Sequence, residues 1–207
     1  MTGRPLLVAI DGPAGSGKST VSRRLADRLG LERLDTGAMY RAVAWAVLAR
    51  DLDPEDRGND DTVAALAGSL DLEVGERVVA DGVDITEAIR GPEVSRAVSN
   101  VAANAGVRRA LVDRQRRWAE EHGGGVVEGR DIASVVFPDA DLKVYLTASP
   151  EERALRRSEE GAAALTRRDH LDSTRAVSPL EVADGAHVVD STDRSIDDVV
   201  EEVLGWL

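Results

Sequence analysis

The sequence contains no cysteine, and this absence narrows the chemistry open to the chain. Without cysteine there are no disulfides, no thiolate metal sites and no cysteine nucleophiles. No apolar run approaches the ~20 residues that a membrane-spanning helix needs. The first five residues carry one positive charge with no apolar core behind them, so we expect no signal peptide, no membrane partner and a cytoplasmic location.

Lysine is almost absent as well. Only two of the 26 basic residues are lysine, Lys18 and Lys143, and the others are arginine. A lysine at position 18 therefore points to a chemical reason for that side chain. The net charge of −12 argues against a nucleic-acid polymer as partner, because nucleic-acid binders usually carry a basic domain. Small anionic substrates remain possible, since they need only a local cluster of cations.

Short, continuous apolar runs typical of buried parallel strands alternate with segments of helical periodicity along the 207 residues. The predicted strands are Leu6–Ile10, Glu32–Leu34, Gly125–Glu128, Leu142–Leu146 and Ala186–Val189. Alternation of this kind predicts an α/β fold, an open parallel sheet covered by helices on both faces. The length fits a single domain, 1–207.

The segment from Leu70 to Ile89 has a different pattern, in which short apolar runs are broken by glycine. It predicts a small antiparallel hairpin sheet, inserted at 70–90. Helices are expected over Pro92–Val101 and Val107–Glu120. The arginine-rich stretch 151–175 has little apolar face and is expected to form a helical lid that stands off the core.

Two helix starts can be read from single side chains. We expect Thr36 to cap the helix that follows it, and Ser195 to cap the last helix of the chain.

A glycine-rich loop follows the first predicted strand and precedes a predicted helix. Residues 12–19 read GPAGSGKS and match the pattern G-x-x-x-x-G-K-[ST] without a mismatch. In such a loop successive backbone N–H groups and the helix N-terminus surround a polyphosphate, the lysine reaches the β- and γ-phosphates, and the hydroxyl binds Mg²⁺. The sequence therefore predicts an ATP site made by Gly12, Pro13, Ala14, Gly15, Ser16, Gly17, Lys18, Ser19 and Thr20, with Ser19 as the metal ligand.

The loop alone does not distinguish kinases from GTPases and motor ATPases. A guanine-reading N-K-x-D motif is excluded here, because neither Lys18 nor Lys143 stands in one. A motor ATPase domain is usually larger. A compact kinase remains, whose acceptor must be bound by residues outside the loop.

The chain resembles the bacterial cytidylate kinases, a family of P-loop nucleoside monophosphate kinases, from Val8 to its C-terminus. The segments that carry the resemblance are Ala9–Pro13, Leu34–Arg41, Glu128–Ile132, Val136–Ala140 and Arg168–Arg175. The hairpin insert looks like the one that sets these enzymes apart from other nucleoside monophosphate kinases. The stretch between Arg157 and Arg168 is shorter than the lid expected for the family.

The resemblance implies an acceptor site, with 36–105 as the region that binds the nucleoside monophosphate. The residues expected near CMP are Asp35, Thr36, Tyr40, Arg41 and Arg130 at its phosphate, Ser99, Arg108 and Asp131 at cytosine, Arg168 and Asp172 at the ribose, and Arg175 in the phosphate cluster. The residues expected to be catalytic are Lys18, Arg41, Arg130, Arg156 and Arg175.

The residues themselves agree with these roles. Arg130 and Asp131 follow a predicted buried strand, at the strand end where ligands bind in open α/β sheets. Arg168, Asp172 and Arg175 have the i, i+4, i+7 spacing of one helical face.

The expected reaction is phosphoryl transfer from ATP, with Mg²⁺, to CMP and also dCMP, by a monomer in pyrimidine nucleotide metabolism. Two alternatives remain open on the sequence alone. One is a P-loop kinase for another small acceptor, such as UMP, AMP or a hydroxy acid. The other is a nucleotide-binding regulatory protein without turnover.

Overall fold

The computed structural model describes residues 6–156, 167, 169–171 and 180–207, and it divides into two compact units. Unit 1 consists of Met1–Leu34 and Arg116–Leu207, and unit 2 of Asp35–Gln115. Each unit is described by itself below. No helix among the described residues is both long and apolar enough to cross a membrane.

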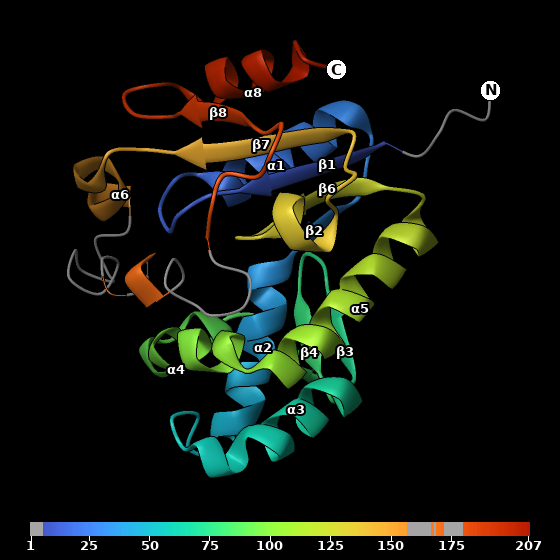
Figure 1. Ribbon diagram of the computed structural model, residues 1–207, viewed down its shortest axis with the longest axis vertical. Coiled ribbons are helices and arrows are strands. Elements are labelled where there is room, and N and C mark those ends of the chain that lie inside the picture. The colour runs from blue at the N-terminus through green and yellow to red at the C-terminus, as the bar shows by residue number, and fades with distance from the viewer. Residues whose placement is uncertain (1–5, 157–166, 168, 172–179) are drawn as a thin grey trace. The chain divides into compact units, whose positions relative to one another are not determined.

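A five-stranded sheet in the order β2-β6-β1-β7-β8 forms the centre of unit 1 (Figure 1). Its strands are β1 (Leu7–Asp11), β2 (Arg33–Asp35), β6 (Gly125–Glu128), β7 (Leu142–Thr147) and β8 (His187–Asp190). The pairs β1–β6, β1–β7 and β7–β8 are parallel, with Ile10 beside Glu128 and Asp11 beside Tyr145. The predicted parallel sheet is confirmed, and each predicted strand lies within one residue of an observed one.

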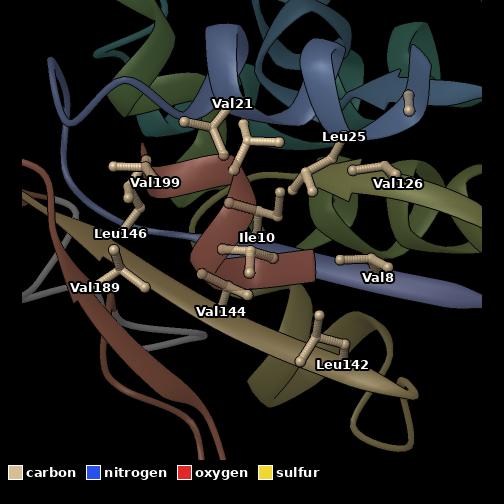
Figure 2. Packing of buried hydrophobic residues seen from close by; sticks show 13 residues of the cluster. Val8, Ile10, Val21, Leu25, Val126, Leu142, Val144, Leu146, Val189 and Val199 are labelled. Carbon is tan, nitrogen blue, oxygen red and sulfur yellow. The ribbon is translucent and has the colours of Figure 1, made fainter. Parts of the chain in front are cut away.

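Helices α1 (Lys18–Leu29) and α8 (Ile196–Leu204) pack on one face of this sheet. Figure 2 shows Val8 and Ile10 of β1 facing Val21 and Leu25 of α1, with Val199 of α8 in the same cluster. Ala9, which points to the opposite face, is also buried. Burial on both faces explains why the strands read as continuous apolar runs rather than as an alternating pattern.

Two short helices follow strands in unit 1. A π-helical turn, η3 (Ile132–Val136), comes three residues after β6, and α6 (Pro150–Arg156) comes after β7. Helix α8 begins as the sequence predicts, with the Ser195 side chain accepting a hydrogen bond from the Asp198 N–H at 3.1 Å. The lid expected at 151–175 continues beyond α6 into 157–166, 168 and 172–175, which lie outside the described residues.

Unit 2 joins helices to a small antiparallel sheet. Its helices are α2 (Thr36–Leu48), α3 (Asp60–Ser69), α4 (Pro92–Ala103) and α5 (Ala105–His122), which runs on past the boundary, with the short turns η1 (Arg57–Asn59) and η2 (Ala88–Arg90). Strands β3 (Leu72–Val74), β4 (Val78–Ala80) and β5 (Val83–Asp84) pair antiparallel. The predicted small antiparallel sheet is therefore confirmed, with its strands lying between Leu72 and Asp84.

The start of α2 corrects one expectation. Thr36 is the first residue of the helix and not its cap. The cap is Asp35, whose carboxylate accepts the Ala38 N–H at 3.0 Å. Both residue types are good caps, and the longer acidic side chain one position earlier reaches the free N–H group.

Candidate phosphoryl-transfer site

The glycine-rich loop runs from the carboxyl end of β1 to the first turn of α1. Gly12 has φ 147° and Gly15 has φ 77°, values in the left-handed range that favours glycine. A Cβ on Gly12 would lie 1.9 Å from the Leu146 carbonyl oxygen, and one on Gly15 would lie 2.8 Å from the Arg153 carbonyl oxygen. Both the backbone conformation and the close packing therefore require glycine, and they give the loop its tight path around the helix N-terminus.

Polar groups of the loop lie where a phosphate group would need them. The Lys18 Nζ donates to the Pro13 carbonyl at 2.7 Å, so the ammonium group lies over the loop. Ser16 is fully buried, and its Oγ has no hydrogen-bond partner among the described residues. An orphaned buried hydroxyl is costly unless something satisfies it. The N-terminus of α1 adds positive potential to the same loop.

Glu128, the last residue of β6, connects three elements. Its carboxylate accepts hydrogen bonds from Ser19 Oγ at 2.9 Å and Ser22 Oγ at 3.0 Å, both on α1, and from the Arg33 guanidinium of β2 at 2.6 Å. Only 4% of its side chain is exposed. The residue was not among the predicted site residues. One feature of the sequence could have identified it: an acidic residue at the end of a buried strand, two positions before Arg130-Asp131.

Two arginines of unit 1 donate hydrogen bonds to backbone carbonyls of the loop. Arg130 donates to the Gly12 carbonyl at 3.1 Å, and Arg153 of α6 donates to the Ala14 carbonyl at 3.2 Å. The Asp169 carboxylate accepts the Ala14 N–H at 3.2 Å, pairs with Arg153 and lies 3.5 Å from Arg130. One carboxylate thus already gathers a loop N–H group and two guanidinium groups, which is a donor set suited to an anion.

Arg156 is tied to the same loop through Ser191. Its guanidinium donates to Ser191 Oγ at 2.9 Å and to the Ser191 carbonyl at 2.8 Å. The Ser191 hydroxyl, itself buried, donates to the Ser16 carbonyl at 3.0 Å. The predicted residue Arg156 therefore lies at the loop. Ser191 and Arg153, which also contact the loop, were not among the predicted site residues.

Asp131 lies between β6 and η3, on the turn that follows Glu128. The neighbouring Asp11 ends β1 and is buried, with both of its carboxylate oxygens accepting backbone N–H groups of η3. The pKa of Asp11 is raised to about 6, chiefly by burial and to a smaller extent by the charge of Asp131, against the lowering effect of the hydrogen bonds from Ala133 and Ile132 and of the Lys18 charge.

In unit 2, five of the residues predicted for the acceptor lie on three helices, with Thr36 as the first residue of α2. Tyr40 and Arg41 are on α2, Ser99 is on α4 and Arg108 is on α5. The Arg108 guanidinium carbon lies 5.7 Å from the centroid of the Tyr40 ring, in the range of a cation–π contact. Arg41 donates to the Ile89 carbonyl at 2.8 Å and to Ser95 Oγ at 2.9 Å.

Those contacts hold Arg41 towards η2 and the start of α4. Asp35 and Thr36 stand at the N-terminus of α2, as described above. The structure therefore distributes the predicted acceptor residues over both units, with Arg130 and Asp131 in unit 1. Arg168, Asp172 and Arg175 lie outside the described residues, so their predicted roles stay predictions.

The parallel sheet, the glycine loop with its lysine, and the acidic strand end beside it define a P-loop kinase fold. A family model described as cytidylate kinase matches residues 8–207. The chain belongs to the cytidylate kinase family.

The similarity to individual relatives extends over nearly the whole chain. The chain is 50% identical to a cytidylate kinase of Rhodococcus opacus (strain B4), covering 99% of this chain and 95% of that protein. It is 49% identical to one of Rhodococcus jostii (strain RHA1), with the same coverage. The crystal structure of an uncharacterized protein from Eubacterium ventriosum ATCC 27560 matches with a TM-score of 0.52 and 13% identity, over 98% of this chain and 97% of that one, which supports the fold alone.

Proposed function

We infer that this chain carries out the reaction of its family, the transfer of the γ-phosphoryl group of ATP to CMP to give ADP and CDP. The observation that carries the inference is the phosphate loop, with Lys18, Ser19 and the Glu128 carboxylate brought together, in a chain 50% identical to a named cytidylate kinase. We also propose dCMP as an acceptor. The reaction belongs to pyrimidine nucleotide metabolism.

Phosphoryl transfer between two phosphate groups needs little general-base chemistry, because the acceptor oxygen is already ionised. The enzyme must hold two polyanions in line and stabilise the charge of the transferring group. In our proposal the backbone of Gly12–Thr20 surrounds the ATP phosphates and Lys18 lies against the β- and γ-phosphates. The buried Ser16 hydroxyl, which lacks a partner among the described residues, is then available to the nucleotide.

The residues at Ser19 fit a magnesium ion. The Ser19 hydroxyl and a Glu128 carboxylate oxygen are 2.9 Å apart, and Mg²⁺ prefers such oxygen ligands, usually one or two from the protein with the rest from phosphate and water. When bound, Mg²⁺ neutralises charge on the β- and γ-phosphates. Glu128 holds the Ser19 hydroxyl in place, and Arg33 in turn fixes the Glu128 carboxylate.

Arginine side chains supply the remaining positive charge. Arg130 and Arg153 already converge on the Asp169 carboxylate beside the Ala14 N–H, and phosphate oxygens would suit the same donors. We propose that Arg130 and Arg156 act on the transferring group. Arg41 and Arg175 are proposed for the same task from the family resemblance.

Base selection is proposed to depend on Asp131 and Arg108. Cytosine has an exocyclic amine donor where uracil has a carbonyl, so the Asp131 carboxylate would attract the first and repel the second. Arg108 can donate to the ring acceptors, with Ser99 beside it on the family pattern. Asp35, Thr36 and Tyr40 are proposed for the CMP phosphate, and Arg168 and Asp172 for the ribose.

A panel of acceptors tests the proposal. ADP release is measured with Mg²⁺ and ATP in the presence of CMP, dCMP, UMP, AMP or no acceptor. We expect the highest kcat/KM with CMP, a measurable rate with dCMP, and little release without acceptor. A higher kcat/KM with UMP or AMP would mean that CMP is not the preferred acceptor. If ADP release did not depend on any acceptor, the result would favour a regulatory nucleotide-binding protein.

A further inference from the structure

Asp11 is a buried carboxylate that no step of the reaction uses. It is the last residue of β1, directly before Gly12 of the phosphate loop, and it is 2% exposed. Burial disfavours the charged form of a carboxyl group, so a buried aspartate that only fills space would destabilise the fold at neutral pH. An uncharged side chain would close a turn at lower cost.

The two oxygens of Asp11 hold the turn that carries Arg130 and Asp131. Oδ1 accepts the Ile132 N–H at 2.9 Å and Oδ2 accepts the Ala133 N–H at 2.7 Å, so each oxygen fixes one of the first two N–H groups of η3. Those N–H groups have no partner within a helix that begins at Ile132. The Asp11 carboxylate is therefore the cap of this short turn.

Two further contacts fasten the same turn to β1 and the loop. The Gly129 N–H donates to the Ile10 carbonyl at 2.9 Å, and the Arg130 guanidinium donates to the Gly12 carbonyl at 3.1 Å. Asp131 lies between the residues fixed by these bonds and those fixed by Asp11. Its backbone, with φ −145° and ψ 26°, belongs to no regular element. The Asp131 carbonyl accepts the N–H groups of Val135 at 2.9 Å and Val136 at 3.2 Å, so η3 itself and the hydrogen bonds on either side of Asp131 together hold its backbone in place.

We propose that Asp11 is the positioning residue for Arg130 and Asp131, so that one side chain sets both the start of the phosphate loop and the placement of the group that reads the base. The inference rests on the proposed role of Asp131 in base reading. Asp11 touches neither substrate in this account. It acts through the backbone of η3.

Asp11→Asn tests the proposal, because asparagine keeps the size of the side chain but offers one acceptor oxygen for two N–H groups. The cost of leaving a buried polar group unpaired corresponds to a change of roughly 5- to 150-fold in an equilibrium constant. We expect the ratio of kcat/KM for CMP over UMP to fall by about tenfold, at the lower end of that range. The KM for CMP should rise more than the KM for ATP. A residue important only for folding would lower the melting temperature and leave the ratio unchanged.

The matched control is Asp141→Asn. Asp141 also accepts a backbone N–H of β1, that of Leu7 at 2.9 Å, but at the other end of the strand. The same substitution there should leave the base ratio at its wild-type value. Should Asp11→Asn fail to fold by circular dichroism, Asp11→Ser, whose hydroxyl can accept one N–H, replaces it with the same expected fall in the ratio.

Asp131→Ala separates the two possible failures. If Asp131→Ala narrows the CMP-over-UMP ratio and the Asp11 variants do not, the positioning role of Asp11 is wrong while the base-reading role of Asp131 stands. If Asp131→Ala leaves the ratio unchanged, the base-reading role is wrong and the inference falls with it. A fall in the ratio for Asp131→Ala and for an Asp11 variant, with Asp141→Asn unaffected, supports both.

Stability against pH is a further readout of the Asp11 charge. Because its pKa is raised to about 6 from 3.8, the folded state binds more protons than the unfolded state between these values. The contribution of Asp11 to the free energy of unfolding therefore falls as pH rises from about 4 to 6. The difference in stability between Asp11→Asn and wild type should grow in favour of the variant over this range. The titratable groups that face Asp11 include Asp131, Lys18 and Tyr145, which both proteins share. A constant difference would mean that Asp11 does not titrate in this range. The positioning role rests on the hydrogen bonds to Ile132 and Ala133 and is decided by the base ratio.

Discussion

Glu128 shows how one side chain can link the nucleotide loop to the sheet. Its carboxylate accepts hydrogen bonds from two hydroxyl groups of α1 and from a guanidinium group of β2, while its own backbone belongs to β6. Arg33 is nearly as enclosed, with 16% of its side chain exposed. Removing one partner of such a buried pair leaves the other charge uncompensated. Ser19 therefore depends on Glu128 for its orientation, and in our proposal the two residues also share a magnesium site.

Glu128→Gln should weaken the use of Mg²⁺ more than the use of CMP. Glutamine can still accept one hydroxyl hydrogen bond, but it brings no negative charge to a divalent cation. Substitutions in the surroundings of a metal typically cost 10- to 100-fold in affinity. We expect the Mg²⁺ concentration for half-maximal activity to rise by about tenfold, with a smaller change in the KM for CMP. Activity is titrated against free Mg²⁺ at fixed ATP.

The control for this change is Glu201→Gln on α8. Glu201 also pairs with an arginine, Arg28, at 2.6 Å, but both side chains are exposed. Loss of the Glu201 charge should leave the Mg²⁺ concentration for half-maximal activity unchanged. A Glu128→Gln enzyme with a wild-type Mg²⁺ requirement would remove Glu128 from the proposed metal site.

Single residues were predictable where chemistry fixes their spacing. Lys18 and Ser19 follow from the loop pattern, and the structure places Lys18 over the loop and Ser19 beside Glu128. Arg153 and Ser191 could not be predicted in the same way. Their contacts with the loop join segments more than 130 positions apart, and no local pattern specifies such a pair.

At the scale of elements, the turn from β1 to α1 is fixed by backbone shape. Gly15 and Gly30 both have positive φ, 77° and 65°, yet only Gly15 is crowded by a neighbour. Gly30 follows the last residue of α1 in the left-handed conformation that commonly ends a helix. A Cβ added to it would meet no atom within 4 Å. The two glycines therefore separate the effect of the backbone from the effect of packing.

Gly15→Ala and Gly30→Ala form a matched pair. Each should destabilise the fold by about 1–2 kcal/mol, the cost of a side chain in the left-handed region. Gly15→Ala should in addition weaken ATP binding, because its Cβ would meet the Arg153 backbone at 2.8 Å and displace the loop or α6. Gly30→Ala should bind ATP as the wild type does. Urea unfolding and ATP titration give the two readouts, and equal ATP affinity in both variants would contradict the packing argument.

Strand positions were predictable because both faces of the sheet are buried, which leaves short apolar runs that only a strand or a buried helix could explain. The α2 cap was misplaced by one residue for the opposite reason. Asp35 and Thr36 are both good caps, and only the geometry of the Ala38 N–H decides between them. Local propensity thus gives the element, and a specific hydrogen bond gives its boundary.

At the scale of the whole molecule, the division into two units separates the predicted groups. Unit 1 carries the phosphate loop, Glu128 and the arginines at the loop, while unit 2 carries Tyr40, Arg41, Ser99 and Arg108. The sequence suggested one domain with an acceptor-binding region at 36–105, and unit 2, Asp35–Gln115, is close to that region in extent. The assignment of unit 2 to acceptor binding remains our proposal.

The length of the chain also bears on the lid. The alignment with the Rhodococcus opacus relative extends over 218 positions, which is more than the 207 residues of this chain. That relative therefore has residues at positions where this chain has none. The resemblance to the family predicts that the shortening lies between Arg157 and Arg168.

The fate of the γ-phosphoryl group decides whether this chain is a CMP kinase. ATP labelled at the γ-phosphate is incubated with the enzyme, Mg²⁺ and CMP, and the labelled products are separated. We expect label in the β-phosphate of CDP, formed in step with ADP. We also expect Lys18→Ala to lose orders of magnitude in rate while its fold stays intact by circular dichroism. Label released as inorganic phosphate at a rate independent of CMP, or a fully active Lys18→Ala enzyme, would contradict this expectation.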